Sequence, residues 1–189
     1  MRSPLTGIAV TLGLCLTTPA FADATARNGM DVGATVAKVC RLGNATISGG
    51  QNATFNQTDR GGAIALTALA DRNTAAALPS SISVTFDGVC NQTLVVRLVS
   101  THGGLSPQKS VAQNGTSFAE RVDYTATLDW AGNRTTLSTD GKANESAGVA
   151  LSGSRAGSVT LTIAIPAGTQ PLVSGGYSDV LTVEFNSSL

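Results

Sequence analysis

Few side chains in this sequence have the types and spacing that enzyme chemistry requires. His102 is the only histidine, and it stands between Thr101 and two glycines without an Asp/Glu cluster at ligand spacing. Ser106 and Lys109 match the pattern S-x-x-K, but the partner motifs S-D-N and K-T-G are absent, as is the nucleophile elbow G-x-S-x-G. We therefore expect His102 and Ser106 to be loop residues without chemical partners. The sequence predicts a protein that is not an enzyme and holds no metal or cofactor.

The first 22 residues have the pattern of an export signal. Arg2 stands near the start, an apolar stretch runs from Ile8 to Leu16, and Ala20-Phe21-Ala22 supplies a small-x-small cleavage sequence. Residues 1–22 are predicted to be a signal peptide that is removed before Asp23; a buried N-terminal core helix is the alternative. The apolar stretch is too short to span a bilayer as a permanent helix.

Removal of the signal peptide also removes Cys15 and leaves Cys40 and Cys90. Two cysteines in a small exported domain most simply form one disulfide in an oxidising compartment. Two buried free thiols are the alternative. A redox or zinc site is not supported, because the sequence has no C-x-x-C spacing.

The composition indicates a β-sheet protein and excludes an electrostatic nucleic-acid binder. Twelve Lys and Arg balance twelve Asp and Glu, so the chain lacks the excess of basic residues that phosphate binding requires. Only 13% of residues are charged and 42% are apolar, while Thr and Ser together number 42 of 189. Chains rich in Thr and Gly with few charges are typical of sheets joined by many turns.

Apolar and polar residues alternate with a period of two along most of the chain, which predicts strands. The expected strands are Asp31–Val39, Ile82–Phe86, Thr93–Val99, Arg121–Trp130, Ser158–Ile165 and Tyr177–Phe185. Gly- and Asn-rich turn clusters separate them, so we predict a single all-β domain over residues 23–189, folded as an antiparallel β-sandwich. The Ala-rich segment Ala63–Leu78 fits a helix or a strand, and we favour a strand around Ala63–Leu69.

The two ends of the mature chain are its most specific feature. An alternating segment from Gly29 runs into Cys40, and the chain closes with Gly175-Gly176-Tyr177-Ser178-Asp179-Val180-Leu181-Thr182-Val183. Together with the strand around Cys90 and the glycine turn after it, these ends resemble the spore coat protein U domain family, which includes the pilins of archaic chaperone–usher pili. The resemblance covers most of residues 29–185. The Ala-rich segment and the four residues after Phe185 depart from the family pattern.

The resemblance implies an immunoglobulin-like sandwich that lacks one strand, with a hydrophobic groove at the gap. A periplasmic chaperone fills this groove first, and the N-terminal strand of the next subunit then replaces it at an outer-membrane usher. Residues 23–36 would be the donor strand, with Met30, Val32, Ala34 and Val36 pointing into the neighbour's groove. The last strand, with Leu181, Val183 and Phe185 facing inward, would border the groove.

Two readings of function remain open at this point. The first is an exported pilus, fimbria or coat subunit at the cell surface, active in adhesion and biofilm formation, whose partners are chaperone, usher and other pilins. The second is a self-complete secreted binding module, an adhesin or carbohydrate binder, in which Asp31–Val36 pairs within its own sheet. Scarce aromatic residues, 4% of the chain, weigh against sugar stacking.

Overall fold

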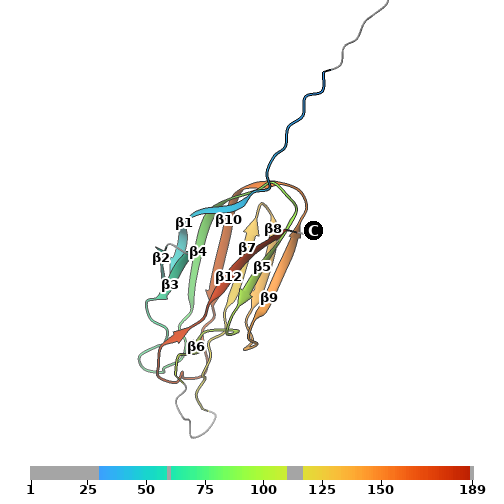
Figure 1. Cartoon of the computed structure of the whole chain (residues 1–189). Helices are drawn as coiled ribbons and strands as arrows, with labels where there is room; N and C mark the ends of the chain where they lie inside the picture. The colour runs from blue at the N-terminus through green and yellow to red at the C-terminus, as the bar shows by residue number, and fades with distance from the viewer. Residues whose placement is uncertain (1–29, 59–60, 110–116, 188–189) are drawn as a thin grey trace, which may run out of the picture. The chain divides into compact units, whose positions relative to one another are not determined.

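The computed structural model describes residues 30–58, 61–109 and 117–187, and throughout these residues the protein is all-β with no helix (Figure 1). The predicted signal peptide and Cys15 lie outside the described residues. The strands are β1 Cys40–Gln51, β2 Ala53–Thr58, β3 Gly61–Leu66, β4 Ser80–Cys90, β5 Leu94–Ser100, β6 Ser106–Pro107, β7 Thr125–Trp130, β8 Asn133–Ser138, β9 Glu145–Leu151, β10 Arg155–Ile165, β11 Tyr177–Ser178 and β12 Leu181–Ser187. In the described part of the chain, no helix is long and apolar enough to cross a membrane.

Two antiparallel sheets make up most of the structure. The larger has the strand order β1-β4-β10-β7-β8, and the smaller has the order β12-β5-β9. Two separate two-stranded pairs stand outside these sheets: the hairpin β2–β3, and β11–β6, whose strands are far apart in the sequence. The predicted all-β class with antiparallel pairing is therefore confirmed.

One hydrophobic core lies between the two sheets. It takes Leu94, Val96 and Leu98 from β5 and Leu128 and Trp130 from β7, all at most 1% exposed. The alternation that predicts strands also selects these side chains: on β7, Ala126, Leu128 and Trp130 are buried, while the residues between them are half-buried. Burying such side chains is worth about 1.5–3 kcal/mol each, which orients the strand.

The disulfide Cys40–Cys90 is present and ties the start of β1 to the end of β4. The two cysteines are direct partners in the antiparallel register, with their Cα atoms 4.1 Å apart. The two-thiol alternative is thereby excluded in the structure.

The first predicted strand is not formed. Residues 30–39 have no regular secondary structure, and β1 begins only at Cys40. A strand needs the hydrogen bonds of a neighbour to form. No ladder pairing reaches residues 30–39 within the described part of the chain.

Two other predicted segments differ in detail. The strand predicted over Tyr177–Phe185 is divided into β11 and β12, because Asp179 turns its carboxylate inward between them. In the Ala-rich segment the structure has a strand, β3, and then a turn in which Asp71 accepts hydrogen bonds from the backbone of Asn73 and Thr74.

Candidate functional site

The two sheets lie close together along one side of the structure but not along the other. β8 and β9 lie next to each other on one side. On the other side β1 ends the larger sheet and β12 ends the smaller one, and neither has a second ladder neighbour among the described strands. Each edge strand leaves alternate N–H and C=O groups pointing away from its sheet.

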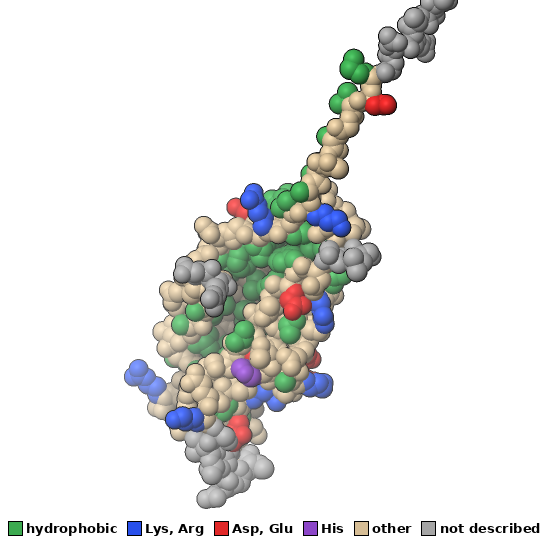
Figure 2. Space-filling view, in the orientation of Figure 1, with side chains coloured by type: hydrophobic (Ala, Val, Ile, Leu, Met, Phe, Trp, Pro, Cys, Tyr) green, Lys and Arg blue, Asp and Glu red, His purple; other side chains and the backbone are tan. Residues whose placement is uncertain are grey.

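An apolar groove of about 690 Å³ lies between these two edges. Its apolar lining includes side chains from β4, β10 and β12: Ile82, Val84, Phe86, Leu161, Ile163, Ile165, Leu181 and Val183. Val84 is only 1% exposed, whereas Phe86, Ile163, Leu181 and Val183 keep part of their surface in solvent. Figure 2 shows hydrophobic side chains gathered in a hollow on this face of the molecule.

The hairpin of β2 and β3 adds a wall to the groove. Ala53 pairs with Leu66 and Phe55 with Ile64, so these four side chains share one face of the hairpin. All four line the groove. The opposite face carries polar residues on β2 and small residues on β3, all of them exposed: Thr54, Asn56, Thr58, Gly61, Ala63 and Ala65.

The predicted groove strand is β12. Leu181, Val183 and Phe185 are partly buried and pack against the core, and the ring of Phe185 meets Trp130 edge-on at 5.7 Å between centroids. Leu181 and Val183 line the groove. Phe185 is not among the residues that line the groove.

The predicted donor residues lie in the N-terminal unit of the chain, which ends at Val36. Met30, Val32 and Val36 are 89%, 94% and 85% exposed, and Ala34 is exposed as well. Large aliphatic side chains alternating with small residues in an exposed segment are suited to strand addition.

A buried carboxylate fixes the end of the groove where β12 begins. Asp179, whose side chain is 3% exposed, accepts hydrogen bonds from the hydroxyls of Ser100 at 2.5 Å and Tyr124 at 2.8 Å. It also accepts from the backbone N–H groups of His102 at 2.9 Å and Val180 at 2.7 Å. Asp179 therefore connects β12 with the end of β5 and with the segment before β7.

These contacts set the protonation states at this end of the groove. Burial alone would raise the pKa of Asp179, but its hydrogen bonds with Ser100, His102, Tyr124 and Val180 outweigh burial and lower that pKa. Burial raises the pKa of the Tyr124 phenol, and its bond to the Asp179 carboxylate raises it further. At neutral pH this end holds an anionic carboxylate that accepts from a neutral phenol.

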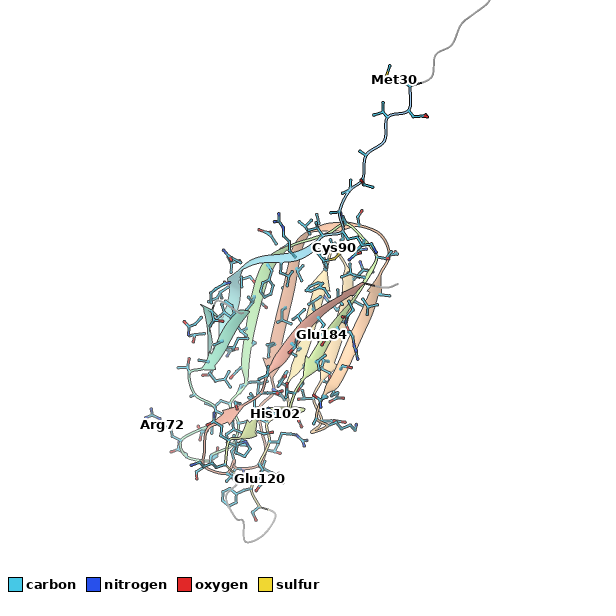
Figure 3. All side chains as sticks on the ribbon, in the orientation of Figure 1. Met30, Arg72, Cys90, His102, Glu120 and Glu184 are labelled. Carbon is cyan, nitrogen blue, oxygen red and sulfur yellow. A yellow bond between two sulfur atoms is a disulfide. The ribbon has the colours of Figure 1, made fainter. Side chains whose placement is uncertain are left out.

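His102 lies in a loop, as expected, but the expectation that it has no partner is wrong, and so is the expectation that Ser106 is a loop residue. His102 Nδ1 lies 3.3 Å from Asp179 Oδ1, although the imidazole is half exposed (Figure 3). Ser106 belongs to β6 and pairs with Ser178 of β11. The described residues contain no group of three or more His, Cys, Asp or Glu side chains arranged to hold a metal.

Sequence reasoning missed Asp179 and the hairpin wall. Asp179 stands within the C-terminal motif, but its burial depends on Ser100 and Tyr124, which are 79 and 55 residues away. Phe55 and Ile64 alternate with small residues as strand residues do, and that alternation is the signal that could have found them.

No protein-family model matches the chain, and no curated protein is similar to it.

Proposed function

We propose that this protein is a structural subunit that polymerises by strand addition, the N-terminal segment of one copy filling the groove of the next. The observation that carries the proposal is the apolar groove between two unpaired strand edges, β1 and β12. On this proposal the two sheets form an immunoglobulin-like sandwich that lacks one strand. Residues 23–36 of the neighbour supply that strand.

The chemistry of the segment matches the chemistry of the groove. A strand laid between β1 and β12 offers backbone groups to the free edges and turns every second side chain inward. Met30, Val32 and Val36 would each gain about 1.5–3 kcal/mol on burial, and each new backbone hydrogen bond adds about 0.5–1.5 kcal/mol. Such a head-to-tail contact does not close on itself, so it generates a fibre.

The same proposal implies how the subunit is exported and assembled at the cell surface. An open apolar groove is an aggregation hazard for a free subunit. We therefore propose export to the periplasm, protection by a chaperone, assembly at an outer-membrane usher, and a place in a surface pilus or coat, as in the spore coat protein U domain family. No catalytic role is included.

Electrophoresis of the mature protein without boiling tests the polymer directly. We expect a ladder of species that collapses to one band on boiling, because strand-exchanged contacts resist detergent until the fold is lost. Deletion of residues 23–36 should abolish the ladder. A single band for the full mature chain, at concentrations where it is folded, would overturn the proposal and favour a self-complete binding module.

A further inference from the structure

The hairpin of β2 and β3 has features that a passive wall would not need. It pairs with no other sheet, and an isolated two-stranded hairpin is marginally stable in water. Its apolar face, formed by Ala53, Phe55, Ile64 and Leu66, is only partly buried although it lines the groove. A strand lying in the groove would cover that face.

The hairpin is fixed firmly at its base. Asn52 has a left-handed backbone, φ 56°, and its side-chain amide donates to Ala68 O and to Ser80 Oγ, both at 2.7 Å. The carbonyl of the same side chain accepts from the Ala68 N–H at 2.9 Å. Asn52 thus anchors both ends of the hairpin to the start of β4.

Near its tip, a side-chain contact joins the hairpin to β1. Gln57 Oε1 accepts from the backbone N–H of Ala45 at 3.0 Å, within the bulged part of the β1–β4 pairing. Gln57 lies on the same face as Phe55. Gly62 leaves room for the Phe55 ring, since a Cβ at Gly62 would lie 2.0 Å from that ring. The ring therefore lies over Gly62, toward the tip of the hairpin.

We propose that the β2–β3 hairpin is a clamp for the incoming strand, anchored at Asn52 and latched to β1 by Gln57, with Phe55 packing on the docked side chains. This inference rests on the proposed function, because the occupant is residues 23–36 of a second copy. The Asn52 and Gln57 contacts are already in place without an occupant. The clamp therefore controls how long the strand stays, since Phe55 packs on the strand only after it has entered the groove.

The test uses the mature protein captured as separate molecules on a sensor surface and a synthetic peptide of residues 23–36 as the probe. We expect Phe55→Ala to speed peptide dissociation at least about tenfold, and Gln57→Ala about fivefold. Asn56→Ala is the matched control, because Asn56 lies on the opposite, exposed face of the same strand. The peptide should dissociate from the Asn56→Ala variant as slowly as from the wild type.

Hydrogen exchange of the wild-type protein gives a second measurement that needs no variant. Backbone amides of β2 and β3 should exchange more slowly once the peptide is bound. If the wild type binds the peptide, but Phe55→Ala matches Asn56→Ala and hairpin exchange is unchanged, the clamp alone is overturned. If the wild type binds no peptide, the proposed function fails, and the clamp with it.

Discussion

Asp179 links the ends of several strands through one carboxylate. It accepts hydrogen bonds from the hydroxyls of Ser100 and Tyr124 and from the backbone of His102 and Val180, with almost no contact with water. Its replacement would leave buried donors without an acceptor, which costs more than the bonds themselves contribute.

The lowered pKa of Asp179 makes stability depend on acid. A carboxyl whose pKa is lower in the folded state adds stability above its unfolded pKa, and this is lost as pH falls through the folded value. We expect the free energy of unfolding to decline below about pH 4. Asp179→Asn should lower it by about 3 kcal/mol at pH 7 and flatten the acid decline.

Urea unfolding between pH 2 and 7 measures this dependence. His102→Ala is the comparison variant, since the half-exposed imidazole adds at most about 1 kcal/mol while the His102 backbone bond to Asp179 remains. An unchanged acid slope in Asp179→Asn would contradict the role given to this carboxylate.

The disulfide acts through the unfolded chain. Cys40 and Cys90 are 50 residues apart, and closing such a loop stabilises by about 4 kcal/mol in the chain-entropy model. We expect the protein purified without reductant to release no titratable thiol after denaturation. The double variant Cys40→Ser, Cys90→Ser should unfold at a clearly lower urea concentration, and equal midpoints would show that the bridge adds nothing to stability.

At the scale of strands, the donor segment and the groove can be tested within one chain. Grafting residues 23–36 onto the C-terminus through a flexible linker, in a chain from which the natural segment is deleted, should fill the groove from within. We expect a soluble monomer that unfolds far more cooperatively than the plain deletion. Circular dichroism during thermal unfolding measures the difference.

Val32→Asp in the graft should remove this gain, because an unpaired carboxylate in a dry groove costs several kcal/mol. Asp31→Asn is the control, since it alters the neighbouring side chain on the opposite face of the strand. A graft that changes neither solubility nor unfolding would mean that the groove is not completed by this segment.

How far the sequence predicts the strands depends on their surroundings. β4, β5, β7 and β10 are recognised from alternation because at least one of their faces is buried in the core. β1 is largely exposed, so its sequence carries little hydrophobic period: Cys40–Gln51 contains two glycines in succession and only Leu42 and Ile47 as large apolar residues. The position of the groove depends on which strands lie at the edges of the sheets. The alternation of residues within one strand does not determine that strand order.

At the scale of the whole molecule, the proposed strand addition would have a direction. A variant that carries the graft at its C-terminus and keeps its natural residues 23–36 can donate a strand but cannot accept one. Mixed at a low fraction with wild-type protein, it should shorten the fibres in proportion to its share, as seen by electron microscopy. The control is the grafted variant without its natural residues 23–36, which can neither donate nor accept a strand and should leave fibre length unchanged. If both variants shorten the fibres, directional growth is contradicted.

Trp130 gives this protein a built-in optical probe. It is the only tryptophan in the chain, it is 1% exposed, and its indole N–H has no hydrogen-bond partner in the described residues. One neighbour is Phe185 of β12, edge-on to the indole, and another is Gly88, where an added Cβ would lie 2.9 Å from the indole ring. An indole in such dry surroundings emits at short wavelength, and any shift of β12 changes its surroundings. Intrinsic fluorescence can therefore follow movements of β12, the strand that borders the groove, in real time, without a label and from a single site.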